Sequence, residues 1–204
     1  MSDDFTRSLI SELQAKATWA RNAYWPRYVF IHINKTAGSS IERALGLTFE
    51  HKTARQKFVE LGESRWQRAF KFSFVRNPWD KVVSHYHYRV KTNQTGMGDG
   101  HIGFPDWVRA AYHERDPRYY DKPQMFAPQA DWLADDSGKL IVDFIGRFET
   151  LASDIASVQR ILQRPITLPH LKSSSHTNFQ SYYDDSSWAI VASHFSKDCT
   201  LFGY

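Results

Sequence analysis

An apolar, β-rich run over residues 28–33 ends abruptly in a loop of small and polar residues, after which the pattern turns helical. The sequence of this loop is Lys35-Thr36-Ala37-Gly38-Ser39-Ser40. Glycine and small neighbours at the end of a strand let backbone N–H groups turn toward a bound phosphate or sulfate. Lys35 adds a positive charge, and the hydroxyl side chains add hydrogen-bond donors. The loop is therefore predicted to hold an anion.

The same succession of strand, turn and helix recurs about forty residues later, over residues 72–86. Asn77 is a good N-cap and Pro78 fits the first helical position, so the start of this helix is well defined. Arg76 is predicted at the end of the strand, and Ser84 about two turns into the helix. Two anion-binding loops predict a ligand with two anionic ends.

These two loops resemble those of the sulfotransferases that use 3'-phosphoadenosine 5'-phosphosulfate (PAPS). Within this family the chain is most similar to the branch of carbohydrate 2-O- and chondroitin-type enzymes. The resemblance covers residues 28–204. It implies that residues 35–40 form the 5'-phosphosulfate loop, and that Arg76 and Ser84 hold the 3'-phosphate. Asn34 departs from the family, which usually has proline before the lysine, but this change removes no ligand group.

The resemblance implies transfer of a sulfuryl group from PAPS to a hydroxyl, giving PAP and a sulfated product. A carbohydrate acceptor is favoured, while small glycans, glycolipids and secondary metabolites stay open. By analogy with phosphoryl transfer, the reaction requires positioning, leaving-group stabilisation and removal of one proton. Lys35 is expected to stabilise the bridging oxygen, and Arg76 to grip its phosphate through a fork that lysine cannot copy. No metal is expected to be required.

His51 is the first candidate for the general base. It follows a predicted strand at 47–49 and should lie at the same sheet edge as Lys35. Histidine has a pKa suited to proton transfer near neutrality, and relatives of this branch carry a catalytic histidine at the matching place. Glu42 and Glu149 are alternative bases, and His51 could instead be an ordinary loop histidine.

Two further loops are expected near the site. The family resemblance implies that the tract containing Lys172 and Ser174 lies over the nucleotide, although a solvated surface loop would have the same composition. The polar, glycine-rich segment 92–100 is predicted to be a mobile loop that borders the acceptor cleft.

Apolar periodicity predicts strands that alternate with helices. Strands are expected near 28–33, 47–49, 70–75 and 140–148. Helices are expected near 39–46, 53–61, 78–92, 105–114, 150–163 and 185–197. This order predicts a P-loop-like α/β/α fold with three layers and a mainly parallel sheet, whose ligands bind at the carboxyl ends of the strands. A single sulfotransferase domain is expected over 27–204, with a helix in residues 1–26 packed on it.

Composition limits the partners. The net charge is +4, the pI is about 9.1, and no long block of Lys or Arg is present, so a nucleic-acid partner is not expected. Cys199 is the single cysteine, which rules out an intrachain disulfide and suits a reducing compartment. No apolar run approaches the roughly twenty residues of a membrane span. A soluble, cytoplasmic protein without a membrane span is expected, and its oligomeric state cannot be read from the sequence.

Two other functions fit the same succession of elements. A P-loop kinase or NTPase would carry its lysine at the end of a glycine-rich loop, whereas here Lys35 opens the loop and Gly38 follows. Such an enzyme would also need a carboxylate for magnesium where this chain has Arg76. A non-catalytic nucleotide-binding module is the other alternative, although residues for all the chemical roles are present.

Overall fold

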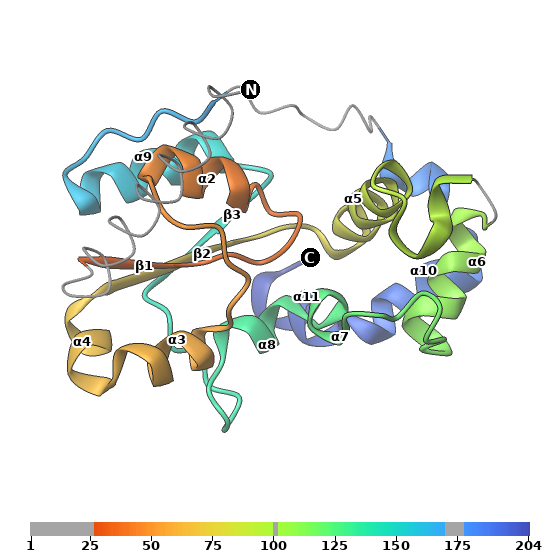
Figure 1. The fold of residues 1–204 in the computed structure, drawn as a ribbon, viewed down its shortest axis with the longest axis horizontal. Helices are drawn as coiled ribbons and strands as arrows, with labels where there is room; N and C mark the ends of the chain where they lie inside the picture. Colours follow the sequence, from red (N-terminus) through yellow and green to blue (C-terminus); the bar gives the residue numbers. More distant parts are fainter. Residues whose placement is uncertain (1–26, 100–101, 170–177) are drawn as a thin grey trace, which may run out of the picture.

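The computed structural model describes residues 27–99, 102–169 and 178–204. The helix expected in residues 1–26 therefore lies outside the described residues. Within the described ranges the chain alternates between short strands and helices (Figure 1).

Within the described residues, three parallel strands form the sheet: β1 (Tyr28–Ile31), β2 (Phe70–Val75) and β3 (Phe144–Arg147), in the order β1-β2-β3. The central strand β2 places Phe72 opposite Phe30 of β1. Apolar and aromatic residues occupy both faces of β1. β2 is buried along most of its length, with phenylalanines on one face and Lys71, Ser73 and Val75 on the other. Burial on both faces is typical of a parallel sheet covered on both sides. The predicted α/β fold with a parallel sheet is confirmed.

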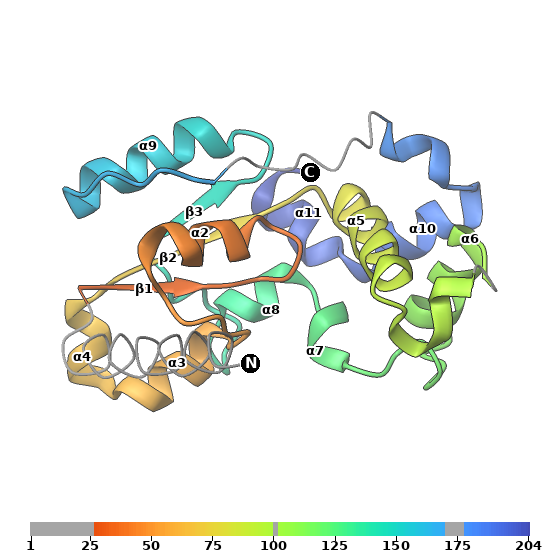
Figure 2. The ribbon, with the colours of Figure 1, turned by 45° about the horizontal axis from the view of Figure 1, so that its top comes forward.

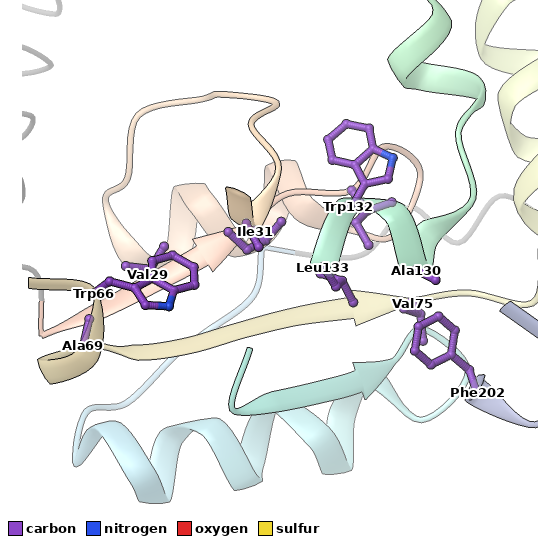
Figure 3. Close-up of a cluster of buried hydrophobic side chains, with 11 residues drawn as sticks. Val29, Ile31, Trp66, Ala69, Val75, Ala130, Trp132, Leu133 and Phe202 are labelled. Atoms are coloured by element: carbon purple, nitrogen blue, oxygen red, sulfur yellow. The ribbon is translucent and has the colours of Figure 1, made fainter. Parts of the chain in front are cut away.

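Helices cover both faces of the sheet and give three layers (Figures 1 and 2). α2 (Gly38–Leu45) and α9 (Leu151–Leu162) lie over one face, while α3 (Ala54–Leu61), α4 (Glu63–Arg68) and α8 (Gln129–Leu133) lie over the other. The buried core beneath α2 and α9 contains Phe30, Ile41, Phe72, Phe74, Ile155 and Val158. The core on the opposite face contains Val29, Ile31, Trp66, Val75, Trp132 and Leu133 (Figure 3). Each face of the sheet thus has its own apolar core.

A second group of helices packs beside the sheet (Figure 1). It comprises α5 (Pro78–Lys91), α6 (Phe104–Val108) with the π-helical turn η2 (Arg109–His113), and α10 (Asp185–His194). Its shared core is rich in aromatic residues, including Trp107, Tyr112, Phe126 and Phe195. α5 begins at the sheet edge, directly after β2 and the second loop, and its later residues pack in this helical group.

Short elements connect these parts. They are the 3-10 helices η1 (Gln94–Asp99) and η3 (Phe179–Tyr182), and the helices α7 (Pro123–Phe126) and α11 (Ser196–Phe202). η1 falls inside the polar segment predicted as a loop, and it buries Met97. Among the described helices, none combines the length and the apolar character that crossing a membrane requires.

Three predicted elements differ from the structure. The strand expected over 140–148 is limited to β3, Phe144–Arg147, and Leu140 makes only an isolated antiparallel bridge with Ala134. Residues 47–49 form no strand, because this segment runs outside the sheet and the backbone N–H of Glu50 bonds instead to the side chain of Glu42. The helix predicted over 185–197 is divided into α10 and α11 at Phe195, a buried residue whose φ and ψ of −102° and 24° interrupt the helix.

Candidate active site

A cavity of about 660 Å³ brings the predicted loops together. Five of the six residues in the first loop line it, the exception being Thr36. Arg76 and Ser84 of the second loop and His51 line the same cavity. Its volume falls within the range of about 300–1,000 Å³ that small-molecule sites occupy. Residues that are far apart in the sequence therefore face one ligand-sized space.

The backbone shapes the first loop. Lys35 and Ala37 have φ values of 70° and 68°, in the left-handed region that residues other than glycine rarely adopt. Among the described residues, no side chain caps α2, and its first turn has no acidic residue. The uncapped N-terminus of α2, which carries the positive end of the helix dipole, lies at the cavity. This arrangement suits an anion.

Two polar residues fix the entry to this loop. The hydroxyl of Thr36 is buried and donates to the carbonyl oxygen of Ile33 at 2.8 Å, so it shapes the loop from below the cavity. Asn34 donates from Nδ2 to the carbonyl oxygen of Met125 at 3.0 Å. This bond ties the loop entry to α7.

Close packing explains why position 38 is glycine. A Cβ atom added to Gly38 would lie 1.8 Å from Cδ2 of the buried His32 ring. That separation is far inside van der Waals contact, so no side chain fits while His32 stays in place. The first loop is packed directly against His32, the residue that follows β1.

Lys35 lies at the cavity wall in a setting that favours a bound anion. Its Nζ is 4.2 Å from the centre of the Tyr88 ring, a cation–π contact. Burial, together with the positive charges of Arg76 and Lys91, lowers the pKa of Lys35 to about 8. A nearby negative charge would favour the protonated form of Lys35 and raise its pKa again.

Arg76 connects the two loops. Its side chain is 4% exposed, with Nε donating to Oδ2 of Asp80 at 2.7 Å and Nη1 donating to the carbonyl oxygen of Lys35 at 3.1 Å. The guanidinium carbon lies 4.0 Å from the centre of the Phe148 ring. These contacts hold the planar guanidinium in one orientation at the edge of the cavity.

The start of α5 follows the sequence prediction. Asn77 is its N-cap, with Oδ1 accepting from the backbone N–H groups of Trp79 and Asp80, and Pro78 occupies the first helical position. Ser84 lies two turns further along α5, nearly buried, and lines the cavity. The helix thereby holds Ser84 and Arg76 in a fixed relation.

His51 reaches the cavity although the strand expected before it is absent. Its Nδ1 lies 3.0 Å from the carbonyl oxygen of His32, and the two imidazole centres are 4.2 Å apart. Gln124 donates from Nε2 to the carbonyl oxygen of His51 at 3.0 Å. Burial lowers the pKa of His51 below its ordinary value of 6.5. The ring is therefore neutral near pH 7 and able to accept a proton.

Comparison with known proteins identifies the family. A family model described as "Sulfotransferase family" matches residues 26–204. The chain belongs to the sulfotransferase family. An uncharacterized protein of Archaeoglobus fulgidus is 34% identical to this sulfotransferase over 97 residues, which cover 46% of this chain and 68% of that protein. No significant match among solved structures was found for this sulfotransferase.

Both carboxylates considered as alternative bases have other partners in this sulfotransferase. Glu42 is 4% exposed, with Oε2 lying 2.8 Å from Nδ1 of His32 and Oε1 accepting from the N–H of Glu50. Glu149 is exposed, accepting from the N–H of Asn77 at 2.6 Å and from the Tyr204 hydroxyl at 3.1 Å. Of the three candidate bases, His51 lines the cavity.

Sequence reasoning missed several cavity residues. His32, Tyr88 and Phe148 contact the predicted site residues, but none was singled out. Two of them carried a signal in the sequence. His32 interrupts an apolar strand, and Tyr88 lies one helical turn after Ser84 and so shares its face of α5. The contact of Phe148 with Arg76 could not be read from the sequence, because it depends on β3 pairing with β2.

Some predictions fall outside these observations. Lys172 and Ser174, expected over the nucleotide, lie outside the described residues. Within the described ranges, no group of three or more His, Cys, Asp or Glu side chains is arranged to hold a metal ion.

Proposed function

We propose that this sulfotransferase transfers a sulfuryl group from PAPS to a hydroxyl of a carbohydrate acceptor, giving PAP and a sulfated product. One observation supports PAPS as the sulfuryl donor: the Arg76 guanidinium donates a hydrogen bond to the carbonyl oxygen of Lys35, at 3.1 Å. It joins two cationic loops at one cavity. A nucleotide with anionic groups at both ends can therefore contact both loops at once.

The first loop suits the 5'-phosphosulfate. Its uncapped helix N-terminus offers backbone N–H groups, and Lys35 offers a positive charge beside them. During transfer the bond from sulfur to the 5'-phosphate oxygen breaks, and negative charge grows on that oxygen. Lys35 is the residue that stabilises this charge.

The second loop suits the 3'-phosphate. The guanidinium of Arg76 and the hydroxyl of Ser84 line the same cavity, and arginine binds phosphate through charge-assisted hydrogen bonds. The positive charge that the reaction needs comes from Lys35 and Arg76. We therefore expect transfer to continue when divalent metals are removed with a chelator.

His51 is the proposed base. It takes the proton of the acceptor hydroxyl as the acceptor oxygen bonds to sulfur, and its low pKa keeps it in the accepting form at neutral pH. The ring of Phe49 lies 5.0 Å from that of His51, lines the cavity and is 60% exposed. An exposed aromatic face beside the base gives a surface on which a sugar ring can stack, which supports a carbohydrate acceptor.

Calorimetric titration with PAP tests the donor assignment, and transfer of labelled sulfate from PAPS to a panel of sugars, glycolipids and small metabolites tests the reaction. We expect PAP to bind and sulfate to reach a carbohydrate. We also expect His51→Ala to bind PAP normally and to lose about 10²- to 10⁴-fold in transfer rate. Failure of the wild type to bind PAP would end the proposal. Magnesium-dependent ATP hydrolysis would instead support the kinase or NTPase alternative.

PAP binding by the wild type without sulfate transfer to any acceptor would favour the non-catalytic nucleotide-binding alternative. An active His51→Ala variant would remove the base assignment and leave the donor assignment intact. Sulfation of a glycolipid or a small metabolite in preference to free sugars would correct the acceptor alone.

A further inference from the structure

Glu42 is a buried carboxylate whose two oxygens both have partners. Oε2 lies 2.8 Å from Nδ1 of His32, a close contact whose angle departs from that of a well-directed hydrogen bond. Oε1 accepts from the backbone N–H of Glu50 at 3.1 Å. A buried carboxylate is costly unless its partners are in place. Glu42 therefore joins the end of β1 to the segment that contains His51.

His32 extends this connection to the proposed base. Its carbonyl oxygen lies 3.0 Å from Nδ1 of His51. Its ring, held on one side by Glu42, packs on the other side against Gly38 in the first loop. The side chain of Glu42 thus reaches His51 along two routes, through His32 and through the backbone of the neighbouring Glu50.

The contact with the His32 carbonyl fixes which nitrogen of His51 carries the proton. A carbonyl oxygen only accepts hydrogen bonds, so Nδ1 of His51 must be the donor. In the neutral ring the lone pair is then on Nε2, which is the nitrogen left to accept a proton from the acceptor hydroxyl. Loss of this contact would let the proton exchange between the two nitrogens.

We propose that Glu42 is a positioning residue, which sets the tautomer and orientation of His51 by holding both His32 and the backbone of Glu50. This inference rests on the proposed function, in which His51 is the base. It replaces the alternative in which Glu42 itself takes the proton. The chain Glu42–His32–His51 also ties the base to the anion loop, because His32 packs on Gly38.

The pKa of His51 gives a second way to test the proposal, because nearby charges shift it. The groups that act on the pKa of His51 are His32, Glu42 and Lys81, and Glu42 raises it. Glu42→Gln removes this negative charge with little change in shape. Its amide oxygen can serve one of the two donors, His32 Nδ1–H or Glu50 N–H, while its NH₂ group opposes the other. We therefore expect the pKa of His51 to fall further and its position to loosen.

NMR of protein labelled with ¹⁵N at histidine tests this directly, with His51 assigned by comparison with His51→Ala. In the wild type the neutral ring of His51 should be the Nδ1–H tautomer alone. In Glu42→Gln and Glu42→Ala we expect a mixture of tautomers and a lower titration midpoint. Affinity for PAP should stay within about threefold of wild type. With an acceptor in hand, kcat should fall about 10- to 100-fold at unchanged KM for PAPS.

Glu60→Gln is the matched control, because Glu60 is bound at the surface to Lys52, the residue after His51. It should leave the His51 spectrum unchanged. An unchanged tautomer and midpoint in folded Glu42→Gln would overturn the positioning role, even if Glu42→Ala fails to fold. Failure of the wild type to bind PAP would break the proposed function instead, and the histidine spectra would still decide the link between Glu42 and His51.

Discussion

The two loops at the sheet edge are proposed anion sites of different kinds. After β1, the chain adopts left-handed conformations at Lys35 and Ala37 and starts α2 without a side-chain cap among the described residues. After β2, Asn77 caps α5 and takes up N–H groups at its start. A capped helix has fewer N–H groups to offer a ligand. The first site therefore depends on main-chain geometry, and the second on the side chain of Arg76.

This contrast determines how each site should fail. A main-chain site is sensitive to any added atom that moves the loop, because its donors cannot change rotamer. A side-chain site tolerates small shifts but depends on the chemical group that it presents. Substitutions in the two loops should therefore differ in both the size and the kind of their effects.

Gly38→Ala is expected to have the largest effect. The added methyl group would collide with His32, at 1.8 Å from Cδ2, and would force the loop or the histidine to move. Overpacking of this kind costs about 1–3 kcal/mol in stability. Displacing the donors by an ångström should weaken PAP binding by about 100-fold or more. Calorimetric titration with PAP and thermal unfolding measure the two effects.

Gly103→Ala is the matched control for this substitution. Gly103 has a φ of −67°, which alanine adopts readily, and the nearest atom to an added Cβ is Asp106 Oδ2 at 3.9 Å. It should bind PAP as the wild type does. Binding by Gly38→Ala within threefold of the wild type would mean that the first loop does not act through its main chain.

Arg76→Lys is expected to have the next largest effect. Lysine keeps the positive charge but loses the fork and the planar contact with Phe148, which lies 4.0 Å from the guanidinium carbon. Loss of one charge-assisted hydrogen bond costs about 1.5–3 kcal/mol, so PAP affinity should fall about 10- to 100-fold. Calorimetry of folded protein measures this loss.

Arg118→Lys, in an exposed pair with Asp116, is the control and should leave PAP affinity unchanged. If Arg76→Lys binds PAP as well as the wild type, charge alone is enough. The second site would then not need the shape of arginine.

Local signals made both loops predictable. Asn77 and Pro78 encode the start of α5 by themselves, and the small residues around Gly38 encode a tight loop before α2. The parallel sheet followed from strands that alternate with helices. The structure agrees with the two loop predictions because each depends on residues close together in the sequence. It agrees with the sheet prediction because the alternating order of strands and helices favours a parallel sheet.

The contacts between segments could not be predicted in this way. The contact of Glu42 with His32 exists because α2 packs back over the end of β1. The contact of Arg76 with Phe148 exists because β2 and β3 end side by side in the sheet. Residues 47–49 have the β-branched and aromatic character of a strand, but their segment finds partners outside the sheet. His51 does lie near Lys35 at the cavity, as expected, but the strand that was expected to place it there is absent.

Binding of PAP is expected to weaken as the pH rises, and this tests the charge in the first loop. Lys35 has a pKa of about 8 in the free protein, so it is protonated at pH 7 and mostly neutral at pH 9. If its charge is needed, PAP affinity should fall about tenfold between these pH values, since phosphate is already mostly in its dianionic form at pH 7. Calorimetry across this range measures the slope.

Lys35→Met tests whether the dependence of PAP affinity on pH comes from Lys35. It should bind PAP weakly and with little dependence on pH. If the full dependence persists, the proton belongs to Lys81, whose pKa burial also lowers to about 8. In that case the positive charge that PAP binding requires would come from Lys81 in α5 and not from Lys35 in the first loop.

Asn77→Ala should have the smallest effect on binding. It tests whether the main chain of the second loop takes part in PAP binding. Loss of the N-cap should destabilise the protein by about 1 kcal/mol, lowering Tm by about 2–4 °C in a domain of this size. PAP affinity should change less than about twofold, because in the proposed site the 3'-phosphate is held by the side chain of Arg76 and not by the N–H groups that Asn77 caps. Thr53→Ala, which removes the cap of α3, should lower Tm by a similar amount. If Asn77→Ala instead weakens PAP binding as much as Arg76→Lys, the main chain of the second loop also binds, and the two sites work by the same means.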